Sequence, residues 1–324
     1  MGYIEEKTKD LYAYLPALTK KDDFEHFWAR TIAQAKDVPL RAERAEVDYP
    51  SPHVKVYAIS YNGMDETRIH GWFIVPSFIG KTSYPCLIHY HGFSGSRGKP
   101  SDYMHWVTMG FAVLAVDCRD QGGSTGNSAA YSHGFTTNVA SKGIHNKDEY
   151  YYRFAYMDGL KAIDMAVTQP EVDQEKLVIE GGSQGGALGM AVCALDDRPA
   201  LALVDVPSNS DLVSRIEGNH GAFASVADYL KMHPEQTDLV MDNLSYFDTM
   251  NMADKIKCPV FASVALKDET CPAQMYFATY NRIQSEKEII MYPFNGHEGG
   301  GSTHTEAKLA YLEKHYADWF RLFT

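Results

Sequence analysis

The segment that decides the fold is Lys176-Leu177-Val178-Ile179-Glu180-Gly181-Gly182-Ser183-Gln184-Gly185-Gly186-Ala187-Leu188-Gly189-Met190-Ala191-Val192. It starts with a short run rich in apolar and β-branched side chains, which predicts a strand. It ends with a run of alanine and other apolar residues, which favours a helix. Glycines surround the serine between the two runs. The segment therefore predicts a strand, a tight turn and a helix in immediate succession.

The same alternation of strand and helix extends on both sides of this segment. Short apolar runs predict strands at 86–90, 111–116, 177–179, 201–206, 260–265 and 288–292. The segments between them predict helices near 102–109, 148–168, 184–195, 273–284 and 304–322. Strands that alternate with helices favour a mostly parallel central sheet with helices on both faces. The predicted fold class is therefore α/β.

Two parts of the chain depart from this alternation. Near the start, apolar residues at helical spacing over 22–34 predict an N-terminal helical extension, and the patterns at 54–59 and 69–75 predict an antiparallel hairpin. Later, over fifty residues separate the strands at 201–206 and 260–265, and they contain helix-like pieces. This connection is too long for an ordinary loop. We interpret about 207–257 as a helical cap embedded in a single domain that spans residues 1–324.

The glycine-rich turn contains the pattern G-x-S-x-G, centred on Ser183. A serine in a sharp strand-to-helix turn adopts unfavourable backbone angles, and side chains two residues to either side would collide, so glycines are needed there. This setting is the nucleophile elbow of the α/β-hydrolase fold. The helix that follows brings its amide dipoles close to a developing oxyanion. Ser183 is therefore the predicted nucleophile.

A serine hydroxyl reacts only when a base takes its proton, and histidine is the usual base. In this fold the order along the chain is serine, acid, histidine. His297 follows the predicted strand at 288–292 and precedes the last predicted helix, which is the place of the base. His304 and His315 are alternatives, but both are expected on solvated faces of that helix. His297 is therefore the predicted base.

The acid should follow a strand that lies between the serine and the histidine in the chain. Asp268 lies just beyond the strand at 260–265, where a carboxylate can fix the imidazole tautomer and stabilise its charge. Asp205 also ends a strand, and Glu269 is adjacent to Asp268. We predict Asp268 as the acid and keep Asp205 and Glu269 as alternatives.

The loop after the strand at 86–90 reads His89-Tyr90-His91-Gly92-Phe93. Its place in the fold predicts that the backbone N–H of Phe93 forms the oxyanion hole together with the N–H of Gln184. His89 and His91 have the H-x-H spacing of a metal pair, but no convincing carboxylate lies nearby. The G-x-G-x-x-G spacing of a dinucleotide loop is also absent. We therefore expect no metal and no cofactor.

Composition limits the class of partner. The chain has 324 residues and a formal net charge of −12, from 30 basic and 42 acidic residues, so it repels phosphate backbones and anionic membranes. It shows neither a signal-like N-terminal segment nor an apolar stretch of about 18 residues. We expect a cytoplasmic protein with no nucleic-acid or membrane partner. Its five cysteines have no C-x-x-C spacing and are expected to be reduced, buried thiols.

Three short motifs together point to one family more specifically than G-x-S-x-G does alone. They are Arg119-Asp120-Gln121, Gly181-Gly182-Ser183-Gln184-Gly185 and His297-Glu298. With them, nearly the whole chain resembles the acetyl xylan esterase/cephalosporin C deacetylase family, which is carbohydrate esterase family 7. The family's corresponding signatures are R-G-Q, G-x-S-Q-G and H-E.

The resemblance implies a triad of Ser183, His297 and Asp268, with oxyanion donors at Phe93 and Gln184. It implies removal of acetyl groups from small substrates, such as acetylated xylo-oligosaccharides and cephalosporin C. It also implies a homo-hexamer whose active sites face an inner cavity. Arg119, Gln121 and Glu298 are expected to have motif or structural roles near the site.

Two residues depart from the family pattern. Asp120 replaces the glycine of R-G-Q, and Phe93 stands where tyrosine is usual, so a hydroxyl near the acyl site is lost. The change at Asp120 bears on the backbone of that segment and so on the pocket or the subunit contacts. The change at Phe93 bears on substrate preference more than on the chemistry. The same scaffold could also carry a general short-chain carboxylesterase, a peptidase or a binding protein without catalysis.

Overall fold

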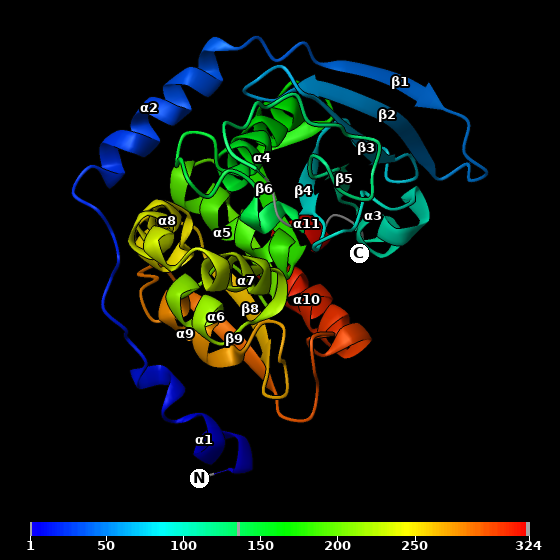
Figure 1. Cartoon of the computed structure of the whole chain (residues 1–324). Coiled ribbons are helices and arrows are strands. Elements are labelled where there is room, and N and C mark those ends of the chain that lie inside the picture. The colour runs from blue at the N-terminus through cyan, green and yellow to red at the C-terminus, as the bar shows by residue number, and fades with distance from the viewer. Residues whose placement is uncertain (1, 135–136, 322–324) are drawn as a thin grey trace.

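The computed structural model describes residues 2–134 and 137–321. In this part of the chain nine strands form one sheet, in the order β1-β2-β3-β5-β4-β6-β7-β8-β9 (Figure 1). The strands are β1 (Glu43–Val47), β2 (Val54–Asn62), β3 (Arg68–Pro76), β4 (Tyr84–Tyr90), β5 (Ala112–Val116), β6 (Val172–Gly182), β7 (Leu201–Asp205), β8 (Val260–Ala265) and β9 (Lys287–Tyr292).

The sheet is mostly parallel, as predicted. All pairs from β5 through β4, β6, β7 and β8 to β9 are parallel, whereas β1, β2 and β3 form an antiparallel edge that joins β5. Every residue of β5 and β8 is buried, which a strand covered on both faces requires. The antiparallel pairing of β2 with β3 confirms the predicted hairpin, while β1 was not predicted.

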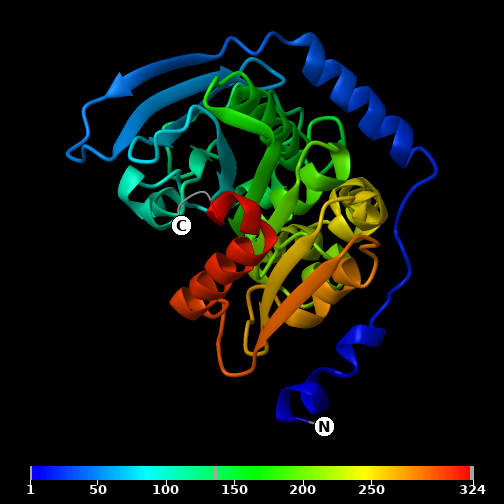
Figure 2. The same ribbon diagram turned by 180° about the vertical axis from the view of Figure 1, so that it is seen from behind.

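Helices cover both faces of this sheet (Figures 1 and 2). On one face, α4 (Tyr151–Val167), α5 (Gln184–Leu195) and α9 (Ala273–Tyr280) pack against the central strands. Figure 2 shows the opposite face, where α10 (Gly301–His315) crosses the strands. The helices α3 (Met104–Thr108) and α11 (Ala317–Phe320) accompany it, and Trp319 of α11 packs edge-on against Tyr84 of β4. The arrangement is that of the predicted α/β-hydrolase fold.

The N-terminal extension consists of two separate helices. The predicted one is α2 (Phe24–Asp37), and it buries Phe24, Phe27 and Trp28. A shorter helix, α1 (Tyr3–Thr8), precedes it, and an extended stretch runs between them along the outside of the molecule (Figure 1). This stretch is attached to the body of the protein by Tyr14, whose hydroxyl donates to the carboxylate of Asp211 at 2.6 Å.

The long connection between β7 and β8 is helical. It contains α6 (Leu212–Glu217), α7 (Ala224–Met232) and α8 (Thr237–Leu244), with single 3-10 turns between and after them. Asp248, a buried residue of this connection, accepts from the backbone N–H groups of Asp211 and Leu212 at 3.0 and 2.7 Å and so fixes the start of α6. The connection lies near the carboxyl ends of the parallel strands, which is where α/β sheets bind their ligands.

Candidate active site

Ser183 lies in the tight turn between β6 and α5, as the sequence predicted. Its φ of 57° and ψ of −119° are unusual for a residue with a side chain. The neighbouring glycines make this turn sterically feasible. A Cβ on Gly185 would lie 1.9 Å from the carbonyl oxygen of Tyr90, and one on Gly181 would lie 2.6 Å from the backbone of Gly185. The turn thus places Ser183 at the carboxyl edge of the sheet.

Three side chains from distant parts of the chain meet at this serine. The Oγ of Ser183 lies 2.9 Å from Nε2 of His297. Nδ1 of the same imidazole lies 2.8 Å from Oδ2 of Asp268. Asp268 follows β8 and His297 follows β9, so adjacent parallel strands deliver both groups to the same edge. The geometry is that of a serine, histidine and carboxylate relay.

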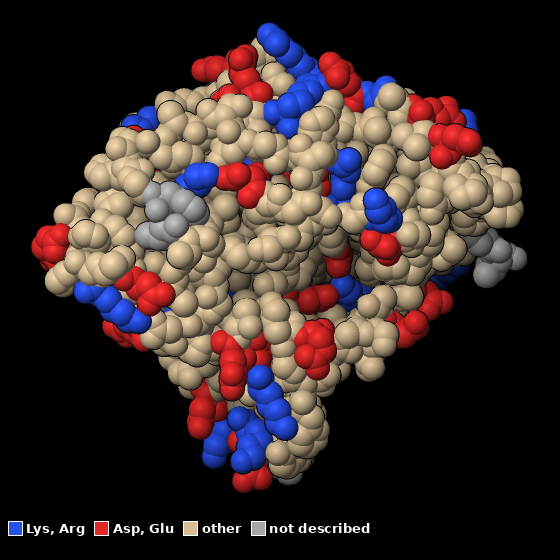
Figure 3. Space-filling model, turned by 45° about the vertical axis from the view of Figure 1, so that its right-hand side comes forward, with Lys and Arg blue, Asp and Glu red and all other residues tan. Residues whose placement is uncertain are grey.

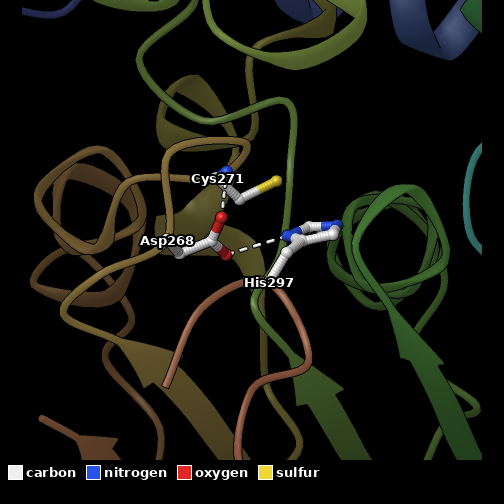
Figure 4. Close-up of side chains that lie close together, drawn as sticks. All are labelled: Asp268, Cys271 and His297. Atoms are coloured by element: carbon white, nitrogen blue, oxygen red, sulfur yellow. Dashed lines mark hydrogen bonds and ion pairs between the residues drawn. The ribbon is translucent and has the colours of Figure 1, made fainter. Parts of the chain in front are cut away.

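The Asp268 carboxylate is buried, and both of its oxygens have hydrogen-bond partners. Its Oδ1 accepts from the backbone N–H groups of Thr270 and Cys271 at 2.9 and 2.8 Å, which leaves Oδ2 for His297 (Figure 4). The hydrogen bond from His297 to Asp268 is the main cause that raises the pKa of His297 well above the usual 6.5. This carboxylate therefore favours a proton on Nδ1 and makes Nε2 a stronger base toward the serine.

His304 and Asp205, which the sequence offered as a second base and a second acid, lie next to each other and away from the hydrogen-bonded relay. His304 was expected on a solvated face, and this prediction was wrong, because His304 is buried with its Nε2 3.0 Å from Asp205. Lys308, one turn further along α10, reaches Asp205 at 2.7 Å and Glu180 at 2.6 Å. The carbonyl of Asp205 accepts from the N–H of Ser183 at 2.8 Å, so this group of charged side chains adjoins the nucleophile turn.

Glu269 and His315 both lie away from the relay. Glu269 is exposed, although it is adjacent to the buried Asp268. His315 is exposed near the end of α10, where a solvated face was expected. The side chain that hydrogen-bonds to Ser183 is that of His297, and the one behind it is that of Asp268. The geometry therefore favours His297 and Asp268 in the roles that the sequence predicted.

The loop after β4 carries Phe93 to the edge of the same cavity as Ser183 and Gln184. His91 fixes this loop. Its Nδ1 lies 2.7 Å from the carbonyl of Gly92, and its Nε2 lies 2.8 Å from the N–H of Cys118. A carbonyl needs a donor and an N–H needs an acceptor, so this imidazole is neutral with its proton on Nδ1. Burial also lowers the pKa of His91.

Gln121 connects the two segments that carry the predicted oxyanion donors. Its Oε1 accepts from the N–H of Ser94, the residue after Phe93, at 2.7 Å. Its Nε2 donates to Oε1 of Gln184 at 2.9 Å and to the hydroxyl of Tyr151 at 2.7 Å. The motif glutamine therefore holds the Phe93 loop and the first residue of α5 at a fixed separation.

Arg119 supports the same segment through buried ion pairs. Its guanidinium forms paired hydrogen bonds with Asp158 at 2.6 and 2.7 Å and with Asp65 at 2.8 and 2.9 Å. Asp120 has a φ of 58°, in the left-handed region where glycine is favoured, which explains why the resembling family has glycine at this position. The carboxylate of Asp120 pairs with Lys142. Arg119 and Asp120 thus shape the backbone that presents Gln121.

Glu298 stabilises the turn that carries His297. Its carboxylate accepts from Nδ2 of Asn295 at 2.9 Å and from the N–H of Gly296 at 3.0 Å. Together with the local backbone, these hydrogen bonds lower the pKa of Glu298. The side chain is exposed and its contacts are with this turn, which favours the structural role that the sequence predicted.

The relay opens into a cavity of about 570 Å³. The described residues that line it include three that sequence reasoning did not place there: Tyr152, Arg215 and Cys271. The Sγ of Cys271 lies 3.9 Å from Oγ of Ser183, and Figure 4 shows it beside the ring of His297. The proximity of Cys271 to Asp268 in the chain was a usable signal. Arg215 and Tyr152 gave none, because nothing local marks which helical residues face the cavity.

The two histidines of the H-x-H pattern do not face a common site. Nδ1 of His89 pairs with Glu180 at 2.5 Å, whereas both ring nitrogens of His91 have backbone partners. The ligand atoms of Asp268, Cys271 and His297 do lie within 4.8 Å of one another. However, Asp268 and His297 already bond to each other, which suits the relay (Figure 4).

The cysteines, the helix lengths and the surface charge can also be compared with the sequence predictions. All five cysteines are free and buried, as expected. No helix within the described residues combines the length and apolar character needed to cross a bilayer. Acidic and basic side chains are interspersed on the face shown in Figure 3, which is hollowed near its middle.

The chain is similar over nearly its whole length to acetyl xylan esterases. The family model described as acetyl xylan esterase (AXE1) matches residues 1–315. An acetyl xylan esterase from Paenibacillus sp. R4 is 37% identical, with a TM-score of 0.91 over 97% of this chain and 99% of that structure. Acetyl xylan esterase 1 from Thermoanaerobacterium sp. JW/SL YS485 is 28% identical, with a TM-score of 0.88 over 98% of both chains.

A curated relative adds a further match. Acetyl esterase Axe7A from Xylanibacter ruminicola is 26% identical over 293 residues, which are 87% of this chain and 64% of that protein. The chain thus spans less than two thirds of that relative's length. The family match, by contrast, covers almost the whole chain. The chain therefore belongs to the acetyl xylan esterase family, a family of carboxylic ester hydrolases.

Proposed function

We propose that this protein is a serine esterase that removes O-acetyl groups from small acetylated substrates through an acetyl-enzyme intermediate. The observation that carries the proposal is the continuous chain of hydrogen bonds from Ser183 through His297 to Asp268. The names of the matched relatives, which are acetyl xylan esterases and an acetyl esterase, favour the acetyl group as the acyl part.

The first half of the reaction forms the acetyl-enzyme. Nε2 of His297 takes the proton of the Ser183 hydroxyl while Oγ attacks the acetyl carbonyl carbon. The carbonyl oxygen becomes an oxyanion, and the backbone N–H groups of Phe93 and Gln184 stabilise it in this proposal. The tetrahedral intermediate then collapses as His297 returns the proton to the leaving alcohol. Asp268 remains ionised and stabilises the imidazolium in between.

The second half repeats these steps with water. His297 takes a proton from a water molecule, and the resulting nucleophile attacks the acetyl carbonyl on Ser183. The same two N–H groups stabilise the second oxyanion. Collapse of this intermediate releases acetate and returns the proton to Ser183. Each residue acts twice, so one cavity serves both halves of the cycle.

The substrate class follows from the size of the site and from the relatives. A cavity of about 570 Å³ suits a small ester and the end of an oligosaccharide. We propose acetylated xylo-oligosaccharides as substrates, and cephalosporin C as a second small acetyl ester that the protein hydrolyses. Release of acetate from a panel of acetylated xylo-oligosaccharides, other acetylated sugars and cephalosporin C ranks these candidates.

The test of the chemistry compares p-nitrophenyl acetate with p-nitrophenyl butyrate. We expect wild-type protein to hydrolyse the acetate much faster, and Ser183→Ala to abolish this activity. A second pair of variants changes one histidine each. His297→Asn changes the histidine of the relay, and His315→Asn, which changes an exposed histidine of α10, is its matched control. If wild type releases no more p-nitrophenol than Ser183→Ala, the esterase proposal is wrong. Similar rates on butyrate would instead favour a general short-chain carboxylesterase.

The assembly stays a prediction from the resemblance, and the compartment stays a prediction from the sequence. We propose a homo-hexamer in the cytoplasm, in which the active sites face an inner cavity that admits oligosaccharides but not polymers. Size-exclusion chromatography with light scattering gives the mass of the particle relative to the 36.3 kDa chain. Cell fractionation tests the compartment. The helical connection at 207–257, which we interpret as a cap, supplies part of the cavity wall.

A further inference from the structure

One charged side chain of the active-site cavity lacks a counter-ion. Arg215 lies on α6, in the helical connection between β7 and β8, and lines the cavity together with Ser183 and His297. It is only 1% exposed. Its Nη1 donates to the carbonyl of Thr270 at 2.9 Å, while its Nε is buried and has no hydrogen-bond partner. No ion pair among the described residues includes it.

The other buried arginines among the described residues, Arg119 and Arg153, are paired differently. Arg119 has two carboxylate partners, Asp65 and Asp158, each bound through two nitrogens. Arg153 has Asp148 at 3.7 Å and donates to Thr31 and to the carbonyl of Asp148. A buried cation without such partners is costly, because it has lost water and gained little in return. Arg215 is therefore the exception that needs an explanation.

The described part of the cavity lining supplies no carboxylate that could neutralise the charge of Arg215. Of the described residues that line it, none is aspartate or glutamate, and Arg215 is the only lysine or arginine. The ring of Phe223 lies 5.9 Å from the guanidinium and cannot neutralise it. A chain with a net charge of −12 thus keeps a positive group in the wall of its reaction cavity. Such a group attracts an anion, and the planar fork of arginine suits a carboxylate.

We propose that Arg215 binds a carboxylate on the alcohol part of the substrate, so that acetyl esters of acidic alcohols, such as acetylated sugar acids, are preferred over neutral ones. The inference rests on the proposed acetyl-esterase function. An acetyl group carries only a methyl group beside its carbonyl, so the carboxylate must belong to the leaving alcohol. Arg215 is then a specificity residue, supplied by the connection that we interpret as a cap.

The decisive experiment compares 4-acetoxybenzoate with 4-acetoxybenzamide, which differ in charge but little in shape. The ratio of their kcat/KM values is measured for wild type, Arg215→Gln, Arg215→Lys and Lys231→Gln. Arg215→Gln removes the charge but keeps an amide donor for Thr270, and Arg215→Lys keeps the charge without the fork. Lys231→Gln removes an exposed charge from α7 of the same connection and is the matched control.

We expect wild type to prefer the anionic ester, mainly through a lower KM. Arg215→Gln should reduce this preference by about tenfold or more, the amount expected for a hydrogen bond to a charged group. Arg215→Lys should keep part of it, and Lys231→Gln all of it. An equal loss on both esters would overturn the proposal, since Arg215 would then act on the oxyanion or on the Thr270 loop. An unchanged ratio would overturn it as well.

A measurement on wild type alone covers the case in which Arg215→Gln does not fold. Benzoate should inhibit p-nitrophenyl acetate hydrolysis competitively, and more strongly than benzamide, with the difference falling as salt is added. Equal inhibition by the two compounds contradicts the proposal. Failure of the esterase function itself would be recognised separately, because wild type would then hydrolyse neither ester.

Discussion

The side-chain amide of Gln121 donates to that of Gln184 at 2.9 Å, while its oxygen accepts from the N–H of Ser94 at 2.7 Å. Gln184 and Phe93, the neighbour of Ser94, are the predicted oxyanion donors. Gln121 does not contact the reacting atoms, so it is a positioning residue. The separation of the two N–H groups depends on it.

Gln121→Ala should therefore lower kcat with little change in KM. Removal of a whole oxyanion donor costs about 100-fold to 1000-fold in kcat, so misplacing two donors without removing either should cost about tenfold. Steady-state kinetics on p-nitrophenyl acetate measures the effect. Gln174→Ala, which truncates an exposed glutamine on β6, is the control and should behave as wild type. A Gln121→Ala variant with unchanged kcat would show that the amide pair has no part in positioning.

Asp120 is where the chain departs from the family pattern, and its φ of 58° makes a direct prediction. Asp120→Val should destabilise the fold by about 1 to 2 kcal/mol, because a β-branched residue tolerates the left-handed region poorly. Asp120→Gly relieves this strain but loses the ion pair with Lys142, whose net contribution at a partly exposed site is about 0 to 1 kcal/mol. Its stability should stay close to that of wild type. Urea unfolding monitored by fluorescence distinguishes the two variants, and equal stabilities would contradict the backbone argument.

The pH dependence of the reaction should report His297. The base acts only when it is neutral, so activity is lost as the pH falls through the pKa of His297. Because the hydrogen bond to Asp268 raises this pKa, the acid limb of kcat/KM should lie above pH 6.5. Asp268→Asn removes the carboxylate, and its acid limb should move to lower pH while kcat falls sharply. An acid limb that does not move in Asp268→Asn would mean that another group controls it.

Cys271 should be the cysteine whose modification stops catalysis. Its Sγ lies 3.9 Å from Oγ of Ser183 and lines the cavity, whereas the other four cysteines are buried elsewhere. A small thiol reagent such as methyl methanethiosulfonate should add a group that fills the space of the acetyl substrate. Loss of p-nitrophenyl acetate hydrolysis over time measures this. Cys271→Ala should resist the reagent, and Cys193→Ala should remain as sensitive as wild type. Equal sensitivity of Cys271→Ala would place the reactive thiol elsewhere.

The parts of the site that could be predicted from the sequence are those with a local signature. Ser183 has its glycines and flanking elements, and Asp268 and His297 each follow a recognisable strand, so the parallel sheet brings them together. Arg215 had no such signature, since its role depends on which face of α6 meets the cavity. His304 was misplaced for a related reason. It lies on a helix without an apolar stripe, and its partner Asp205 is far away in the chain.

Lys308 also lacks a local sequence signature, and its position leads to a prediction about stability. It is buried on α10 between Glu180 and Asp205, at 2.6 and 2.7 Å. These carboxylates raise the pKa of Lys308, and Lys308 in turn lowers the pKa of Glu180 against the effect of burial. Lys308→Met should destabilise the protein by about 3 to 5 kcal/mol, because it leaves the buried carboxylate of Glu180 without its lysine. Lys314→Met, at an exposed position of the same helix, is the control.

The pH dependence of this effect has a defined sign. Since the pKa of Glu180 is depressed in the folded state, its contribution to stability is complete above the ordinary value of 4.5 and is lost as the pH falls through the folded pKa. Below pH 4.5 the unfolded state binds a proton that the native state of wild type does not. Lys308 lowers this pKa together with His89, which pairs with the same carboxylate. The lysine is absent in Lys308→Met, so the stability of the variant should fall less steeply with acid. Urea unfolding at several pH values measures the stability of wild type and of Lys308→Met. If the two plots of stability against pH run parallel, the coupling between Lys308 and Glu180 is contradicted.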